Sequence, residues 1–405
     1  MKKFVFLFSK YFLIYVATFV MSMAVKGGNV CGLGPILRMA FYPLKIALFT
    51  YGQRNSLGNG HLENPNESLP DKINVLAEDL FILNTVRNAG EPFVEIRNLR
   101  NDSIILCIPI PKELQTNDYR QRYLACQNDR KDLICVYSST EYKIGLFDLK
   151  KQNWLWIRNT DRDSILLHHR VKFQDDNVIV NIRKMKLLGE KNFTTEGYAI
   201  IDGKSGNFIK KWLVPYSQIP SIIEFQGSKH GGDWDYLHLN DVEIVNLNGK
   251  QSGVLETGDV LLNSRNLNAI LHIRKDSIID TYTGLFFKQH DVDIVNANTI
   301  SVFNNNSHDV YYPWIEGYKS NIVYKNLINN TDSIAFHDIG LNTFTEGQFI
   351  QIGSYKYFEN QNQFEIIITQ NDKIVYRNQQ LNSQDKTKVN LLNWCSIWQL
   401  SLIHI

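Results

Sequence analysis

The sequence lacks an excess of charge of either sign. Its 405 residues include 43 lysines and arginines against 41 aspartates and glutamates, which leaves a net charge of +2. Proteins that bind nucleic acid concentrate basic residues on one surface, and this balance gives no indication of such a surface. We therefore expect no nucleic acid among the partners of the protein.

The motifs of the common nucleotide-dependent and metal-dependent enzymes are missing as well. The chain has no G-x-x-x-x-G-K loop, no G-x-G-x-x-G after a strand, no G-x-S-x-G and no H-E-x-x-H. Its five cysteines form no C-x-x-C pair and no zinc-ligand spacing. We therefore expect no metal and no cofactor. Cys126 and Cys135 flank a polar turn, and two interpretations stay open: a hairpin disulfide in an oxidising compartment, or two buried thiols.

Long apolar runs are confined to the N-terminal region. After a basic start at Lys2 and Lys3, an apolar run extends from Phe4 to Val25, about the length that spans a bilayer. Ser22-Met23-Ala24 resembles a cleavage site, so a removed signal peptide is one interpretation. The length of the run favours an uncleaved membrane anchor in residues 1–30. The basic start would keep the N-terminus inside and place the rest of the protein on the periplasmic or extracytoplasmic side.

Residues 31–72 form a second N-terminal segment. Its apolar part contains two prolines and two basic residues, Pro35, Arg38, Pro43 and Lys45. These residues favour an amphipathic helix at the membrane surface over a second spanning helix. The polar residues 52–72 predict a linker to a domain formed by residues 73–405. A weak helical stripe from Asp71 to Arg87 is the one helical signal after the anchor.

Short alternating strands joined by polar turns fill the rest of the chain. Three hairpins illustrate the pattern: Lys143–Asp148 before Trp154–Ile157, Tyr198–Asp202 before Phe208–Trp212, and Ala269–Ile273 before Ile278–Ile279. Four-strand units that recur at roughly 40–50 residues are typical of propeller blades. The sequence therefore predicts an all-β fold, a six-bladed β-propeller preceded by an N-terminal membrane anchor helix, in preference to a large β-sandwich or a β-helix.

Histidines recur at equivalent places in this pattern. The segment from His169 to the turn at Asn177 aligns without a gap on the segment from His290 to the turn at Asn298. A third copy opens at Asp241, and His238 lies two residues before the equivalent position, an offset that keeps a side chain on the same face of a strand. We expect the three histidines to converge on the central channel of the propeller.

Four ordered motifs contain or follow these histidines. They are His238-Leu239-Asn240-Asp241, the Ser264-Arg265 pair that follows Leu261, Lys288-Gln289-His290-Asp291, and Val302-Phe303-Asn304-Asn305. In this order they resemble the bacterial arylsulfotransferase family, in which the motifs read H-x-N, S-R, Q-H and F-D-N. Leu167-His168-His169 and the run from Thr345 to Phe349 resemble two further blades, so the resemblance covers roughly residues 140–380.

The resemblance implies a propeller that moves a sulfuryl group from a phenolic sulfate ester to another phenol, without a nucleotide sulfate donor. It implies that His290 is a nucleophile that becomes transiently sulfated, in a ping-pong mechanism. It further implies that Arg265 and His238 hold the sulfate oxygens and that His169 assists as a ligand or acid/base group. His168 and Asn240 would contribute to substrate binding.

Three features depart from the family's pattern. Arg170 follows the His-His pair where an acidic residue is usual, Asn304 replaces the aspartate of F-D-N, and extra residues at 248–257 separate H-x-N from S-R. Two other functions suit an anchored propeller. One is a non-catalytic binding or assembly module. The other is a redox protein with a quinone cofactor, which no motif in the sequence supports. Hydrolysis, with water as the acceptor, is a further alternative. The sequence leaves the natural donor, the natural acceptor and the oligomeric state open.

Overall fold

The computed structural model describes most of the chain after the linker. The described residues are 62–63, 72–86, 92–115, 123–138, 142–161, 164–188, 191–215, 217, 228–230, 233–235, 237–247, 253–306, 319–341, 343, 347–360, 365–379, 389–390 and 396–399. The anchor predicted in residues 1–30 and the amphipathic stretch of residues 31–51 lie outside them. Within the described part, no helix has the length and apolar character needed to cross a membrane.

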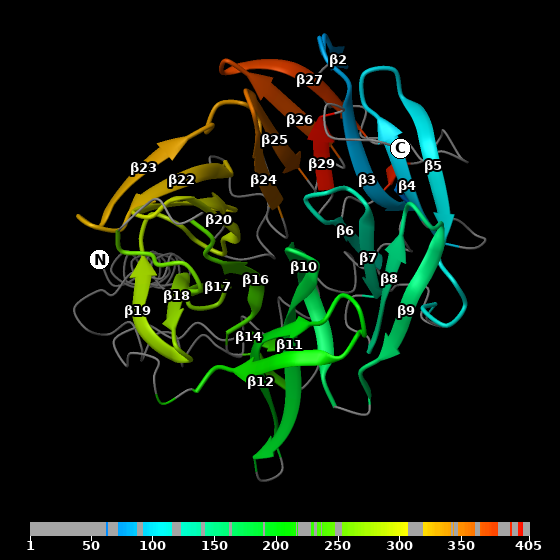
Figure 1. The fold of residues 1–405 in the computed structure, drawn as a ribbon. Helices are drawn as coiled ribbons and strands as arrows, with labels where there is room; N and C mark the ends of the chain where they lie inside the picture. The colour runs from blue at the N-terminus through cyan, green and yellow to red at the C-terminus, as the bar shows by residue number, and fades with distance from the viewer. Residues whose placement is uncertain are drawn as a thin grey trace, which may run out of the picture. The chain divides into compact units, whose positions relative to one another are not determined.

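Six antiparallel four-stranded sheets are arranged around a common centre (Figure 1). Blade 1 consists, from inner to outer strand, of β29 (Ser396–Gln399), β3 (Leu80–Val86), β4 (Phe93–Asn98) and β5 (Ser103–Pro109). Blade 2 consists, in the same order, of β6 (Tyr123–Gln127), β7 (Leu133–Ser138), β8 (Lys143–Asp148) and β9 (Asn153–Asn159). Blade 3 consists of β10 (Leu166–Gln174), β11 (Asn177–Leu188), β12 (Lys191–Ile201) and β13 (Phe208–Leu213). Blade 4 consists of β16 (Leu239–Ile244), β17 (Val260–Ser264), β18 (Ala269–Arg274) and β19 (Ser277–Thr283). Blade 5 consists of β20 (His290–Asn296), β21 (Thr299–Asn304), β22 (Asn321–Asn326) and β23 (Thr331–Ala335). Blade 6 consists of β24 (Gly347–Ile352), β25 (Tyr355–Asn360), β26 (Glu365–Gln370) and β27 (Lys373–Gln379).

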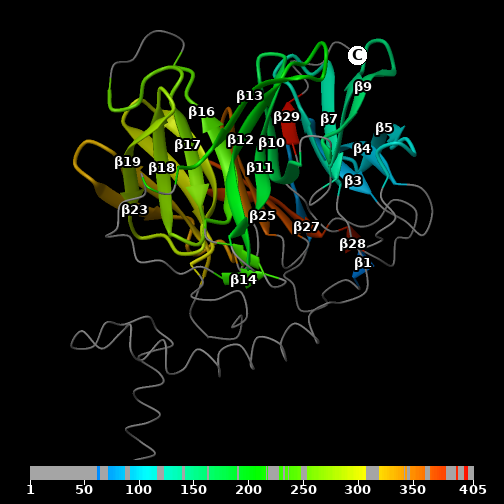
Figure 2. The same cartoon turned by 90° about the horizontal axis from the view of Figure 1, so that it is seen from below.

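Short additional strands extend these sheets. The hairpin β14 (Ser228–His230) and β15 (Asp233–Asp235) joins blade 3 through β12, and β2 (Ile73–Asn74) joins blade 6 through β27. A separate pair is formed by β1 (Leu62–Glu63) and β28 (Val389–Asn390). Figure 2 shows the propeller from the side, with β14 beyond one end of the strands of blade 3.

Blade 1 closes the ring with strands from both ends of the domain. Its inner strand β29 comes from the C-terminal region and pairs with β3, for example Ile397 with Ile82. The inner strands then contact one another in a closed order, β29–β6–β10–β16–β20–β24 and back to β29. The predicted six-bladed propeller is therefore confirmed, and the sandwich and β-helix alternatives are excluded. The weak helical pattern at residues 71–87 does not produce a helix among the described residues of this stretch, which contain β2 and β3.

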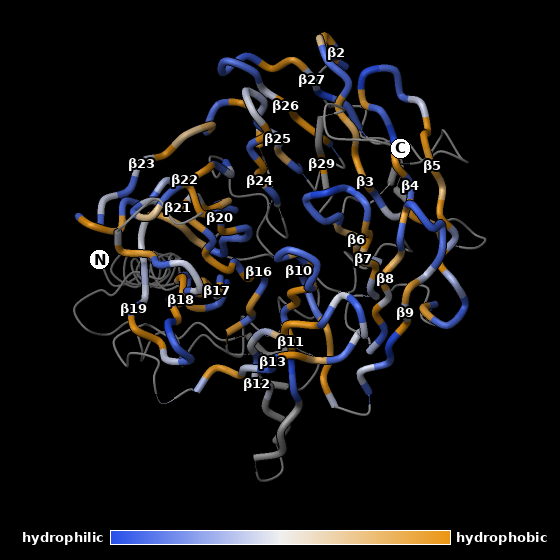
Figure 3. Tube along the Cα trace, viewed as in Figure 1, coloured by the Kyte–Doolittle hydropathy of each residue, from blue (hydrophilic) through white to orange (hydrophobic). Residues whose placement is uncertain are grey.

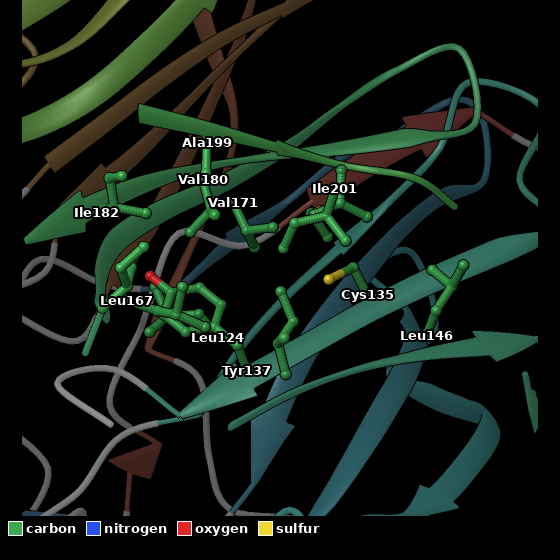
Figure 4. Close-up of a cluster of buried hydrophobic side chains, with 14 of the residues drawn as sticks. Leu124, Cys135, Tyr137, Leu146, Leu167, Val171, Val180, Ile182, Ala199 and Ile201 are labelled. Atoms are coloured by element: carbon green, nitrogen blue, oxygen red, sulfur yellow. The ribbon is translucent and has the colours of Figure 1, made fainter. Parts of the chain in front are cut away.

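The core is divided among the blade interfaces. Six clusters of buried apolar side chains each join two neighbouring blades. Figure 4 shows the cluster between blades 2 and 3, in which Leu124 and Tyr137 meet Val171 and Ile182. Cys126 and Cys135 belong to this cluster as free thiols on directly paired positions of β6 and β7. Apolar residues follow the strands and polar residues the turns (Figure 3), which is the alternation from which the hairpins were predicted.

A buried polar network fixes blade 4. Nε2 of His272 lies 2.7 Å from Oδ2 of Asp259, and Nδ1 lies 2.7 Å from the hydroxyl of Tyr282. The guanidinium of Arg274 donates to both oxygens of Asp259. Burial raises the pKa of Asp259, but the hydrogen bonds from Arg274, the Glu256 amide and His272 outweigh it and lower the pKa to about 2. The carboxylate therefore stabilises the fold in its ionised form.

Asp259→Asn is expected to lower the free energy of unfolding by about 3 kcal/mol, because it removes the buried ionised partner of His272 and of the half-buried Arg274, which keeps only Glu256. The folded-state pKa is about 2 and the ordinary value about 3.9. The loss relative to wild type is therefore full above about pH 4 and shrinks as the pH falls towards 2. Urea unfolding of the two proteins at several pH values measures it. The exposed Asp280→Asn is the matched control and is expected to change stability little.

Candidate active site

The predicted histidines lie where the inner strands of blades 3, 4 and 5 are irregular. The pairing register shifts between His168 and Val171 on β10, between Leu239 and Asp241 on β16, and between His290 and Val292 on β20. A left-handed residue accompanies each shift: His169 with φ of 55°, His238 with φ of 49°, and Asp291 with φ of 46°. Such bulges re-aim side chains out of the strand alternation, so all three strands turn side chains inward at one level.

The structure brings the histidines together. Nε2 of His169 lies 3.1 Å from Nε2 of His238. The ring centroid of His169 is 4.8 Å from that of His238 and 6.4 Å from that of His290. His168 is the neighbour on the other side, at 5.1 Å between ring centroids. The three inner strands thus place four imidazoles within one small volume.

Arg265 joins this group from the end of β17. Its backbone N–H donates to the carbonyl of His238 at 3.2 Å, which ties the two predicted sulfate-binding residues together. Its side chain is buried, and Nη1 reaches the Asn266 side chain at 3.5 Å. The positive charge is close enough to act on His290, as the pKa of that residue shows.

His290 is held as a neutral imidazole. Burial lowers its pKa well below the ordinary value, and the charges of Arg265 and His238 lower it further. Nδ1 lies 3.2 Å from the carbonyl of Lys288. A carbonyl only accepts hydrogen bonds, so the hydrogen belongs on Nδ1 and the lone pair on Nε2. Asn305 meets the same Nδ1 at 3.0 Å, and a half-turn of its amide offers the oxygen that an Nδ1–H requires.

His169 is neutral for related reasons. Burial lowers its pKa well below the ordinary value, and His238, His168, His290 and Arg183 add to the effect in that order. The contact between His169 and His238 then joins two imidazole nitrogens, of which one must donate and the other accept. The site therefore combines a neutral imidazole at His290, the cation of Arg265 and the imidazole pair of His169 and His238, which shares one hydrogen.

Blade 4 supports the backbone in front of His290. Nδ2 of Asn240 donates to the carbonyl of Gln289 at 2.9 Å, so this predicted substrate-binding residue also fixes the strand that carries His290. The Gln289 side chain donates in turn to the Asn263 side chain and to the carbonyl of Ser264, at 2.8 and 3.0 Å. Blades 4 and 5 are thereby joined next to the site.

A layer of charges lies one step further along the inner strands. Arg170, which departs from the family's pattern, forms ion pairs with Asp291 and, at 3.7 Å, with Asp241. Asp241 accepts the backbone N–H of Val292 at 2.8 Å, and Asp291 accepts that of Phe349. Each carboxylate thus joins its blade to the next. An arginine side chain cannot accept a backbone hydrogen bond from the next blade, as an acidic residue at this position could. Arg170 instead joins its blade to blades 4 and 5 by pairing with both carboxylates.

The next layer is charged as well. Lys172 pairs with Glu243 and, at 3.1 Å, with Asp241. Burial and the charge of Arg170 lower the pKa of Lys172 to about 8. Burial also raises the pKa of Asp293, against the opposing charges of Lys172 and Arg170. In these layers, basic side chains pair with acidic ones, so their charges balance. The layers therefore differ from the histidine level, where His169 and His290 are neutral.

The remaining sequence features lie elsewhere. Of the extra residues at 248–257, those from Gly253 onward are described, and Leu255 and Val254 bond to Ala297 and Asn298. This contact is at the end of β20 opposite to His290. Trp212 packs on Tyr198 and donates to the Asp276 carbonyl, a structural role. Of the run from Thr345 to Phe349, the first two residues fall outside the described part of the chain.

Two contributors to the site were not predicted. Asn305 touches His290, and its place in the Phe303-Asn304-Asn305 motif was a usable signal. Glu196 contacts His168 from β12 at 3.6 Å between Nε2 and Oε1. No motif surrounds Glu196, and only the pairing of β10, β11 and β12 brings it to the site.

Residues 139–337 match the sequence model of the family described as arylsulfotransferase (ASST). The chain belongs to the arylsulfotransferase family. The matched segment contains His168, His169, His238, Arg265 and His290, which are the residues that the fold brings together. No curated protein matches the chain.

Among solved structures, a protein of unknown function from Bacteroides caccae is similar, with 11% identity and a TM-score of 0.51 over 80% of this chain and 98% of that one. This likeness concerns the fold alone. Kuenenia stuttgartiensis hydrazine synthase reaches 10% identity and a TM-score of 0.40 over 69% of this chain and 71% of that one. A functionally unknown protein from Desulfotomaculum acetoxidans reaches 9% and 0.41 over 80% and 99%.

Proposed function

We propose that this arylsulfotransferase-family protein moves a sulfuryl group from a phenolic sulfate ester to a phenolic acceptor through a sulfohistidine at His290. The observation that carries the proposal is the state of His290: a buried neutral imidazole whose Nδ1 hydrogen is directed at the Lys288 carbonyl, which leaves the lone pair on Nε2. A neutral imidazole is a competent nucleophile, and the arrangement needs no nucleotide donor.

The first half-reaction forms the N–S bond between Nε2 of His290 and the sulfate sulfur, and breaks the bond from sulfur to the phenolic oxygen. The three other sulfate oxygens carry the negative charge of a loose transition state, by analogy with phosphoryl transfer. Arg265 and His238 are joined through the Arg265 amide and the His238 carbonyl. In this proposal they donate to those oxygens.

The leaving phenolate takes up a proton. The imidazole pair of His169 and His238 can supply it when the pair carries one proton more than two neutral rings, and it is left neutral afterwards. In the second half-reaction the acceptor phenol loses a proton to the same pair. Its oxygen attacks sulfur, and the N–S bond to His290 breaks. His168 and Asn240 border this volume and would contribute to substrate binding. With water as acceptor, the same steps would give hydrolysis.

The proposal is tested by trapping the intermediate. Purified protein is mixed with 4-nitrophenyl sulfate alone, and nitrophenolate release is followed in a stopped-flow instrument. A burst of about one equivalent is expected, followed by a slow phase that phenol accelerates. Peptide mass spectrometry after an alkaline quench should place one sulfuryl group on the His290 peptide. Turnover without any protein-bound sulfuryl group would contradict the covalent mechanism. Absence of nitrophenolate release would favour a binding module.

We also propose that residues 1–30 anchor the protein in a membrane, with the catalytic propeller of residues 73–405 on the periplasmic or extracytoplasmic side. The proposal rests on the apolar run and the basic residues before it. We expect the full-length protein to remain in carbonate-washed membranes. We also expect it to be accessible to protease added outside the inner membrane. Release of full-length protein into the wash would argue for an unanchored protein.

A further inference from the structure

Glu196 is a buried carboxylate behind the histidines. It lies on β12, the third strand of blade 3, and its side chain is fully buried. Its Oε1 accepts two hydrogen bonds from Arg183 on β11, from Nε at 2.9 Å and from Nη2 at 2.6 Å. The same oxygen lies 3.6 Å from Nε2 of His168. One carboxylate thus contacts two neighbouring strands of its own blade.

The other oxygen of Glu196 reaches the next blade. Oε2 accepts the backbone N–H of Leu239 at 3.1 Å, directly after His238. His238 has a left-handed backbone, with φ of 49°, a conformation that costs a non-glycine residue about 1 kcal/mol or more unless its surroundings fix it. On the preceding side, the carbonyl of Leu237 accepts from Ser264 at 2.8 Å. Glu196 fixes the backbone on the following side of His238, and the His238 ring contacts the ring of His169.

Glu196 also acts on the charge around the imidazoles. The guanidinium of Arg183 disfavours a proton on His169. The carboxylate of Glu196, bonded to that guanidinium, opposes this effect. The groups around His169 are His168 and Arg170 on its own strand, Tyr137 from β7, Arg183 from β11, Glu196 from β12, Asp241 and the preceding His238 at β16, and His290 from β20. Of the described carboxylates near these groups, Asp241 and Asp291 pair with Arg170, whereas Glu196 pairs with Arg183.

We propose that Glu196 is a positioning residue for the proton transfer of the sulfuryl-transfer reaction: it holds His238 against His169 and offsets Arg183, so that the imidazole pair keeps the proton that the leaving phenolate takes up. This inference rests on the proposed function. Glu196 touches neither substrate nor the reacting atoms in this scheme. It acts through His168, His238 and Arg183.

The test uses two donors that differ in their need for a proton. Nitrophenolate leaves readily without protonation, whereas the more basic phenolate of phenyl sulfate needs it. Glu196→Gln keeps the shape and an oxygen for the Leu239 N–H but removes the charge. We expect kcat with phenyl sulfate to fall about 100-fold and kcat with 4-nitrophenyl sulfate to fall less than about 5-fold. The alkaline side of the pH–rate profile should move to lower pH, because the unopposed charge of Arg183 makes the imidazole pair lose its proton more readily.

Two further variants separate charge from shape. Arg183→Gln leaves the carboxylate without its cation and should move the alkaline side of the profile to higher pH, because the imidazole pair then keeps its proton longer. The double variant Arg183→Gln/Glu196→Gln removes both charges and is expected to recover at least about 10-fold of the activity with phenyl sulfate. Glu243→Gln, which removes a carboxylate from the charge layer below, is the matched control and should leave the ratio between donors unchanged.

An equal loss with both donors in Glu196→Gln would overturn the proposal, and so would failure of the double variant to restore the ratio. If Glu196→Gln does not fold, as shown by its thermal transition, the opposite shift in Arg183→Gln decides. Failure of the proposed function is distinguishable, because wild-type protein would then form no sulfuryl adduct with either donor. An intact adduct with an unchanged donor ratio would reject the role of Glu196 alone.

Discussion

Replacing His290 with asparagine is expected to lower kcat for sulfuryl transfer on the order of 10⁴-fold or more, since the side chain proposed to form the covalent bond is lost. Asparagine retains a polar group that can donate to the Lys288 carbonyl, so the backbone around β20 should hold. It offers no nucleophilic nitrogen. The nitrophenolate burst and the sulfuryl adduct should both disappear, whereas donor binding persists because Arg265 and His238 remain.

The measurement compares burst amplitude, steady-state kcat and adduct mass in wild type and His290→Asn. His337→Asn is the matched control, because His337 is exposed on the turn after β23 and makes no contact with the four imidazoles. A transfer rate within about 10-fold of wild type in the His290 variant would reject the nucleophile assignment. Retention of the adduct on another residue would assign that role elsewhere, and His169 and His238 are the neighbouring candidates.

Local patterns predicted those parts of the molecule that local forces determine. Hairpins such as Lys143–Asp148 with its partner strand are visible because alternation and turn residues lie next to each other in the chain. The histidines of β10 and β20 were found through the same repeat. The closing strand β29 was not, since its pairing with β3 joins segments more than 300 residues apart and leaves no periodic signal. The stripe at residues 71–87 shows the opposite error, in which tertiary pairing overrides a weak helical pattern.

The site was predictable only for residues inside recognisable motifs. Arg170 read as a departure from the family's pattern, yet it lies between Asp241 and Asp291, two carboxylates from two other blades. Sequence alone does not show this balance, because the three residues meet only when three inner strands reach one axis. Glu196 is a stronger case, since it belongs to no motif and reaches His168 and Leu239 through strand pairing. Motifs thus identify the proposed reacting groups. The fold identifies the residues that position these groups and set the charges around them.

Arg265 offers the second large effect, because in the proposed mechanism one side chain both stabilises the transferring sulfuryl group and adds to the burial that lowers the pKa of His290. Arg265→Gln is expected to lower kcat about 10³-fold, the loss typical of removing a preorganised donor to a developing anion. Arg265→Lys keeps the charge but loses the planar pair of donors, and we expect a loss of about 10²-fold. The exposed Arg130→Gln should leave kcat unchanged.

The pH dependence separates the two roles of Arg265. Neutral His290 is the reactive form, and burial followed by the charge of Arg265 lowers its pKa well below the ordinary value near 6.5. The burst rate of wild type is therefore expected to stay level as the pH falls through 6.5 and to decline only in more acidic solution. In Arg265→Gln the repulsion is gone while burial remains, so the decline should begin at higher pH than in wild type. In Arg265→Lys it should begin near the wild-type pH, because the charge is kept. If both variants kept the wild-type profile, the positive charge would not be what holds His290 neutral, and burial alone would account for its state.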